Sequence, residues 1–158
     1  MAGGPFKTLS TDSLDGTEQL GHAVAQLLLL GDCILLDGDL GAGKTAFARA
    51  VIQSRLGTLE DVHSPTFTLV QPYETPAIDI WHCDLYRLAS PEACLELGLE
   101  DAFETAVTLI EWPERLGTQA PPDALTISIR AFADDSREIT LSSKDATWGT
   151  RMQAILDE

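Results

Sequence analysis

With 158 residues, 44% of them hydrophobic, the chain is expected to form one compact domain spanning residues 1–158, whose core needs no disulfide or metal. Its 25 acidic residues against 10 Lys and Arg give a formal net charge of −15, which argues against stand-alone binding of RNA or DNA and favours a partner with a basic face. Three cysteines without a C-x-x-C pair argue against a zinc site, and the lack of a signal-like start or a membrane-length apolar run predicts a cytoplasmic protein with no membrane contact.

Apolar residues recur at helical spacing in the first third of the chain. A helix is expected from Thr17, interpreted as its N-cap, to about Leu28. The short apolar run 33–38 is typical of a strand that is buried on both faces. A second helix is expected over residues 44–56, and Gly57 is a natural stop for it.

Short apolar or alternating runs continue along the rest of the chain and predict further strands. These are residues 65–74, 76–86, 106–112, 124–132 and 137–143. The last two flank the turn sequence "ADDS" and predict an antiparallel hairpin. Helices are expected from Ser90, with Pro91 in the first position, and over residues 145–156. Strands separated by helices predict a three-layer α/β sandwich with a largely parallel central sheet and an antiparallel C-terminal hairpin.

A glycine-rich sequence, G-x-x-x-x-G-K-T, lies between the first expected strand and the second expected helix. Glycines allow the backbone N–H groups to turn toward a phosphate, Lys44 supplies a positive charge for the β- and γ-phosphates, and the Thr45 hydroxyl is a ligand for Mg²⁺. The strand–loop–helix context is typical of a P-loop NTPase. The predicted nucleotide-binding residues are Gly38, Asp39, Leu40, Gly41, Ala42, Gly43, Lys44, Thr45 and Ala46.

Two carboxylates end apolar runs and are candidates for the Mg²⁺ site and for catalysis. Asp84 ends "AIDIWHCD" and Glu111 ends "TLIE". Because ligands of open α/β sheets lie beyond the carboxyl ends of parallel strands, both side chains are expected near the P-loop. The alternative is that each carboxylate only caps the next turn. The sequence leaves open which of the two would orient the attacking water.

The segment between the second helix and Asp84 contains Ser64 and Thr66 on either side of Pro65. These hydroxyls are suited to a loop that senses the γ-phosphate, and the alternative is an ordinary start of a strand. Trp112, next to Glu111, could serve in core packing, as a platform for the base or as a partner contact. The patterns N/T-K-x-D and D-x-x-G of regulatory GTPases do not occur, and no Arg-rich lid of the kind found in small-molecule kinases is visible.

Five sequence blocks together resemble one family of P-loop proteins. "GDLGAGKT", "SPTFTLVQPY", "HCDLYRL", "LELGLEDAF" and "IEWPERL" occur in this order. In this order and spacing they closely resemble the TsaE (YjeE) family of small bacterial ATPases, over about residues 17–137. The resemblance implies a Mg²⁺-dependent ATPase that binds ATP and ADP and acts in making threonylcarbamoyladenosine in tRNA. It also implies docking on the partner proteins TsaB and TsaD, weak hydrolysis without them, and contact with tRNA only through the complex.

The resemblance also suggests roles for individual residues. Glu111 and Asp84 match the family's two functional carboxylates, so Glu111, Asp84 and Thr66 are expected to be catalytic, and Thr45, Glu111 and Asp84 to bind the metal. Ser13, Thr17 and Arg137 match a region near the nucleotide base. The C-terminal residues 142–158 match nothing specific and are interpreted as a contact surface for a partner of this protein. A small-molecule P-loop kinase remains the main alternative function, and a non-hydrolysing nucleotide-binding scaffold is a second.

Overall fold

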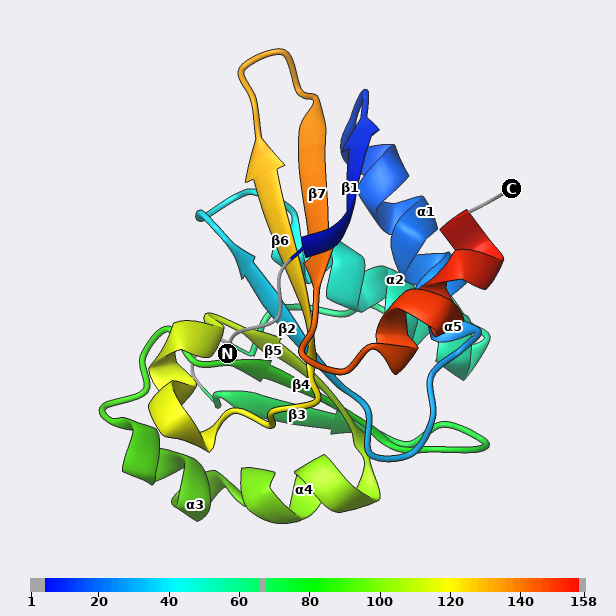
Figure 1. Ribbon diagram of the computed structural model, residues 1–158. Helices are drawn as coiled ribbons and strands as arrows, with labels where there is room; N and C mark the ends of the chain where they lie inside the picture. Colours follow the sequence, from blue (N-terminus) through cyan, green and yellow to red (C-terminus); the bar gives the residue numbers. More distant parts are fainter. Residues whose placement is uncertain (1–4, 66–67, 157–158) are drawn as a thin grey trace.

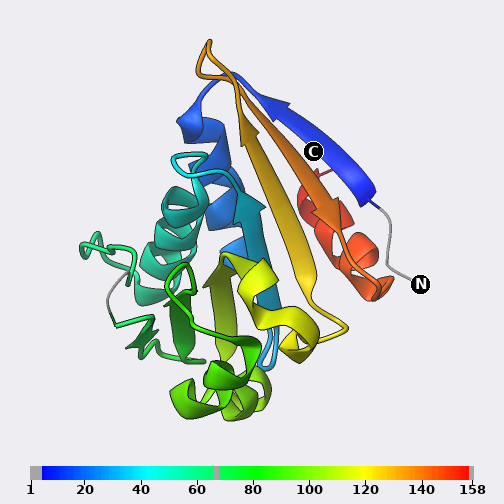
Figure 2. The same cartoon turned by 90° about the vertical axis from the view of Figure 1, so that its left-hand side faces the viewer.

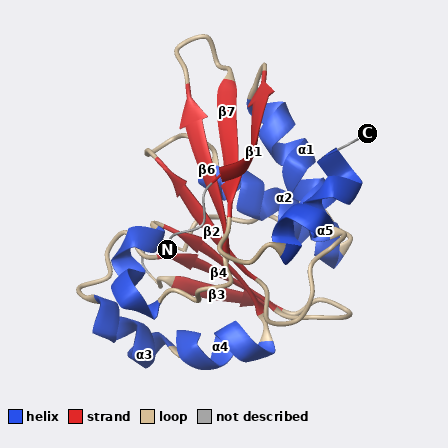
Figure 3. Cartoon of the chain, in the orientation of Figure 1, coloured by secondary structure: helices blue, strands red, loops and turns tan. Residues whose placement is uncertain are grey.

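The computed structural model describes residues 5–65 and 68–156 and contains one twisted seven-stranded sheet (Figures 1 and 3). The strands are β1 (Pro5–Thr11), β2 (Cys33–Gly38), β3 (Val70–Tyr73), β4 (Ile80–Asp84), β5 (Val107–Glu111), β6 (Leu125–Ala131) and β7 (Arg137–Ser142). Their spatial order is β1-β7-β6-β2-β5-β4-β3, and the four central strands β6, β2, β5 and β4 run parallel. The edges pair antiparallel, including the predicted β6–β7 hairpin. The predicted α/β class with a parallel centre is therefore confirmed.

Helices cover the sheet from two sides, which gives the predicted three layers (Figures 1 and 2). The helices are α1 (Leu14–Ala25), α2 (Lys44–Leu56), η1 (Pro91–Ala93), α3 (Cys94–Leu97), α4 (Leu99–Thr105), η2 (Pro113–Gln119) and α5 (Thr147–Leu156), of which η1 and η2 are 3₁₀-helices. On β2, Ile34 and Leu36 belong to the core under α1, α2 and α5. Cys33 and Leu35, pointing the other way, join the core on the α3–α4 side. Burial on both faces explains why β2 is a continuous apolar run.

The strand and the helix that flank the glycine-rich loop match their predicted bounds. β2 spans Cys33–Gly38, and α2 spans Lys44–Leu56. Gly57 ends α2 in a left-handed conformation, with φ of 74°, and its N–H bonds to the carbonyl of Gln53. The loop is therefore held between a buried strand and a buried helix, which is the context that a phosphate-binding loop requires.

Two helix predictions were wrong in detail. α1 begins after Ser13, whose hydroxyl accepts a hydrogen bond from the Asp15 N–H at 3.3 Å, so Ser13 rather than Thr17 is the N-cap. The segment after Ser90 is not one helix but η1, α3 and α4 in succession. Gly98 separates α3 from α4 with φ of 79°, a conformation that ends a helical turn.

β1 and α5 complete the molecule around the β6–β7 hairpin. β1, which was not predicted, pairs antiparallel with β7, and Leu9 lies opposite Ile139 on the helix-covered face. α5 is tied to the start of β2 by Arg151, whose guanidinium contacts both carboxylate oxygens of Asp32 at 3.0 and 2.6 Å. Within residues 5–65 and 68–156, none of the helices is both long and apolar enough to cross a membrane.

Candidate nucleotide-binding site

The loop between β2 and α2 has the backbone conformation expected of a phosphate cradle. Gly38, Gly41 and Gly43 all have positive φ, at 151°, 81° and 119°. A Cβ at Gly38 would lie 2.5 Å from the carbonyl oxygen of Ile129, so only glycine fits where the loop passes β6. The loop then enters α2, where the Phe47 N–H bonds to the Gly43 carbonyl at 2.9 Å. The N–H groups at the start of the helix favour an anion.

Lys44 lies at the start of α2 with its ammonium group turned back over the loop. Its Nζ donates to the carbonyl oxygen of Gly38 at 2.6 Å and lies 3.4 Å from the centre of the Trp112 ring. Burial lowers the pKa of Lys44, and the neighbouring carboxylates, Glu111 first among them, act against this shift. The Trp112 ring also packs against Tyr86, with 5.0 Å between the ring centres. Trp112 therefore forms a wall of the site as well as packing.

Glu111, at the end of β5, contacts the start of α2. The Thr45 hydroxyl lies 2.9 Å from Oε1 and 3.0 Å from Oε2 of Glu111. On the other side, His82 Nε2 lies 2.6 Å from Oε2. Glu111 is only 3% exposed, so these contacts hold the carboxylate beside the P-loop hydroxyl. The structure thus brings together Thr45 and Glu111, two of the residues predicted to bind Mg²⁺.

Asp84 lies at the end of β4, directly opposite Glu111 in the strand register. Its carboxylate accepts hydrogen bonds from the Ser64 hydroxyl and, at 3.1 Å, from the Tyr86 N–H. The bond to Tyr86 is the turn-capping role that the sequence left as an alternative, and the bond to Ser64 joins Asp84 to the proposed sensing segment. Thr66, the third predicted catalytic residue, lies outside the described residues.

Most of the predicted residues line one cavity of about 260 Å³. Its lining residues are Leu14, Leu40, Gly41, Gly43, Lys44, Thr45, Ala46, Ser64, Asp84, Glu111 and Trp112. Within the described part of the chain, no group of three or more His, Cys, Asp or Glu side chains is arranged to hold a metal ion. In phosphate sites Mg²⁺ needs fewer side-chain ligands, because one or two carboxylates act together with phosphate oxygens and water. The oxygens of Thr45, Glu111 and Asp84 meet that requirement.

The three residues predicted near the base lie around the loop and play supporting roles in this structure. Ser13 caps α1, and Thr17 is fully buried, so a contact between Thr17 and a base would require α1 to move. Arg137 is 7% exposed and donates from Nε to the carbonyl oxygen of Ala42 at 3.0 Å. A second hydrogen bond, from Arg137 to the Asp135 carbonyl at 2.6 Å, ties the loop to the tip of the β6–β7 hairpin.

His82 is the residue of this network that the sequence reasoning missed. Its side chain has no exposed surface, and it contacts Glu111 directly. The signal was present in "HCD", because residues two apart on a strand share a face and His82 therefore points the same way as Asp84.

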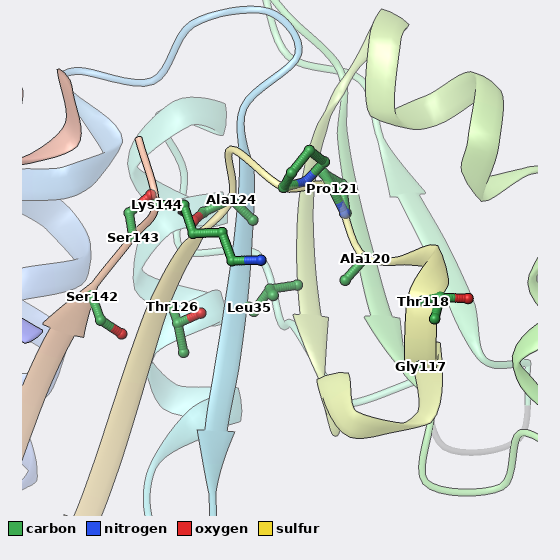
Figure 4. Close-up of a pocket in the computed structure, with 11 residues that line it drawn as sticks. Leu35, Gly117, Thr118, Ala120, Pro121, Ala124, Thr126, Ser142, Ser143 and Lys144 are labelled. Atoms are coloured by element: carbon green, nitrogen blue, oxygen red, sulfur yellow. Dashed lines mark hydrogen bonds between the residues drawn. The ribbon is translucent and has the colours of Figure 1, made fainter. Parts of the chain in front are cut away.

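A larger hollow of about 570 Å³ lies elsewhere, between strands β2 and β6 and the segment around Pro121 (Figure 4). It opens near the start of β6 and the end of β7, whereas the P-loop follows the end of β2. Thr126 and Lys144 lie beside Leu35 in this hollow (Figure 4), and its lining residues include no carboxylate. The smaller cavity at the P-loop therefore carries the groups needed for phosphate chemistry.

Comparison with known proteins shows the family to which the chain belongs and agrees with the fold. The profile of the family described as "Threonylcarbamoyl adenosine biosynthesis protein TsaE" matches residues 11–139. The chain belongs to the TsaE family. The predicted resemblance is therefore confirmed, and as a family member the chain takes part in threonylcarbamoyladenosine biosynthesis.

Two TsaE relatives and one crystal structure illustrate the similarity. The tRNA threonylcarbamoyladenosine biosynthesis protein TsaE of Rickettsia bellii is 41% identical over 133 residues, which cover 84% of this chain and 92% of the relative. The protein of the same name from Bacillus subtilis is 34% identical over 90% of this chain and 86% of its own. The crystal structure of Bacillus subtilis YdiB matches with a TM-score of 0.79 and 29% identity, covering 94% of this chain and 93% of YdiB.

Proposed function

We propose that this TsaE-family chain is a Mg²⁺-dependent ATPase that serves the threonylcarbamoyladenosine modification of tRNA. The observation that carries the proposal is the contact between Thr45, at the start of the P-loop helix, and Glu111, at the end of a parallel strand. A hydroxyl and a carboxylate paired in this way beside Lys44 are the side-chain groups that a protein contributes to a Mg²⁺–nucleotide site. ATP, ADP and Mg²⁺ are the ligands that this site is proposed to bind.

Each group has a role that follows from its chemistry. The loop N–H groups and Lys44 bind the phosphates, while Thr45 and Glu111, with Asp84 nearby, would hold Mg²⁺. When bound, Mg²⁺ would neutralise charge on the phosphates. A carboxylate, Glu111 or Asp84, orients a water whose oxygen bonds to the γ-phosphorus as the bond to the ADP oxygen breaks. ADP leaves with that electron pair, and the water's protons pass to phosphate and solvent.

Hydrolysis by the isolated chain is proposed to be slow. Among the described residues that line the cavity, Lys44 is the one cation, so charge stabilisation on the γ-phosphate is incomplete. We infer that docking on TsaB and TsaD supplies the missing charge stabilisation and completes the site. The net charge of −15 favours a partner protein with a basic face and suits a protein that meets tRNA only through the complex.

The proposal is tested by following tRNA modification by purified TsaB and TsaD with and without this chain and ATP. The expected result is that modification continues beyond a single round only when both are present, with phosphate released and no phosphorylated acceptor. A phosphorylated small molecule would instead support the kinase alternative. Repeated rounds with an ATP analogue that is not hydrolysed would support the scaffold.

A further inference from the structure

His82 occupies a buried position directly behind the proposed Mg²⁺ site. Strand register places it opposite Leu109, two residues before the Asp84–Glu111 pair and on the same face of the sheet. From there its Nε2 reaches diagonally across to β5, 2.6 Å from Glu111 Oε2. His82 is not among the residues that line the cavity, whereas Glu111 is, so His82 acts on the nucleotide site through Glu111.

With Glu111 in the ionised form that would bind Mg²⁺, we assign the hydrogen in this contact to His82. An ionised Glu111 only accepts hydrogen bonds, so Nε2 must carry the hydrogen that lies between them. The other ring nitrogen, Nδ1, is buried and has no partner among the described residues. Leaving a buried acceptor nitrogen without a partner costs less free energy than leaving a buried N–H without one. This difference favours the tautomer with hydrogen on Nε2 alone.

The contact gives Glu111 an orientation that Thr45 does not supply. The Thr45 hydroxyl is almost equally far from the two carboxylate oxygens, at 2.9 and 3.0 Å, so it does not distinguish one from the other. His82 binds Oε2 alone. Because the last torsion of a glutamate side chain is broad and only weakly selective, a second donor on one oxygen fixes the rotation of the carboxylate.

We propose that His82 is a positioning residue, which holds the Glu111 carboxylate in the rotation that Mg²⁺ binding and water orientation require. This inference rests on the ATPase function proposed above. Buried partners that orient a ligand side chain typically matter by 10–100-fold in metal affinity or activity. A purely structural histidine would instead be replaceable by any side chain that fills the same space.

Three substitutions separate positioning from packing. In His82→Gln, the amide nitrogen is separated from Cα by the same number of bonds as Nε2 of histidine, so its N–H can reach Glu111. In His82→Asn, the amide nitrogen is one bond closer to Cα, at the position of Nδ1, and does not reach Glu111. His82→Leu fills the space without a donor. We expect Asn and Leu to lower partner-stimulated kcat about 10–100-fold and to raise the Mg²⁺ concentration needed for turnover. Affinity for ATP without metal should change less than about threefold, and Gln should restore most of the activity. Thermal unfolding of each variant checks that it is folded.

Two readouts keep this test separate from that of the ATPase proposal. Equal activity in the three variants and the wild type, or an equal loss in all three variants, would overturn the positioning role. Absence of Mg²⁺-dependent turnover in the wild type would instead count against the proposed function. In that case ¹⁵N NMR of the nucleotide-free protein still judges the contact. Hydrogen on Nε2 of His82 is the expected result, and a bare Nε2 would refute the assignment.

Discussion

Gly38 shows how closely the backbone of the P-loop is packed against its neighbours. It has φ of 151°, and its α-carbon faces the carbonyl oxygen of Ile129 on β6 so closely that a Cβ would come within 2.5 Å. Gly41, three residues later, also has positive φ, at 81°, but a Cβ added there would meet no atom of the described residues within 4 Å. Substituting Gly41 therefore strains only the backbone, whereas substituting Gly38 also causes a steric overlap with β6.

Gly38→Ala is expected to lower the free energy of unfolding by about 3 kcal/mol or more, since strained backbone and overlap with a backbone oxygen add together. Gly41→Ala should cost only about 1–2 kcal/mol, from its backbone conformation alone. Urea unfolding of the nucleotide-free proteins measures both. Equal losses in the two variants would mean that the loop moves away from β6 and that the close approach is not required.

α5 packs on the core through Trp148 and Met152 and is also held by one partly buried ion pair. Arg151 contacts Asp32 through two nitrogens and also donates to the carbonyl oxygen of Leu27 at 2.6 Å. Its guanidinium lies 4.0 Å from the centre of the Trp148 ring. These contacts link the C-terminal helix to the end of α1 and the start of β2, so the C-terminal segment, interpreted from the sequence as a partner contact, also supports the fold.

Arg151→Ala is expected to lower the free energy of unfolding by about 2–3 kcal/mol, because a mostly buried carboxylate and a carbonyl lose their donors. Arg130→Ala is the matched control, since Arg130 is exposed on β6 and should change stability by less than about 0.5 kcal/mol. Calorimetry of both variants gives the comparison. If Arg151→Ala were no less stable than Arg130→Ala, the contacts of Arg151 with Asp32 and Leu27 would contribute nothing to stability.

At the scale of the whole molecule, the three cysteines gather in the core on the α3–α4 side of the sheet. Burial raises the pKa of the Cys33 thiol from 9.0 to about 12 and also raises the pKa values of Cys83 and Cys94. A thiolate is the reactive form, so all three should be inert in the folded protein.

A thiol reagent at pH 8 is therefore expected to modify none of the cysteines quickly in native protein and all three after unfolding. Ala133→Cys, in the exposed hairpin turn, provides a reactive control.

The thiols of the unfolded chain ionise near pH 9, while Cys33 of the folded protein stays protonated to about pH 12. The stability that the Cys33 thiol contributes is therefore complete below pH 9 and is lost as the pH rises from 9 to about 12. Rapid modification of the native wild type would show that this core opens.

The central strands and α2 were predictable because burial on both faces and helix signals agree within short segments. β1 was not, since Leu9 is the one residue of that strand packed against the core and its other side chains give little alternation. The helix after Ser90 was predicted too long because a glycine such as Gly98 ends a helix only in its tertiary context. Thr45 was predicted from the glycine-rich motif, and Glu111 from its place at the end of a strand. The alternation in "HCD" indicates that His82 points the same way as Asp84, but its contact with Glu111 also depends on the register of β4 and β5.

The central claim is that Glu111 and the P-loop together hydrolyse ATP. The most direct measurement is phosphate release by wild type and Glu111→Ala with saturating Mg²⁺, ATP, TsaB and TsaD, together with ATP affinity. We predict that Glu111→Ala loses hydrolysis by about 10²-fold or more but still binds ATP, while Lys44→Ala loses tight binding and stays folded. A wild-type rate of phosphate release in Glu111→Ala would contradict the account and leave Glu111 as a carboxylate that only ends a strand.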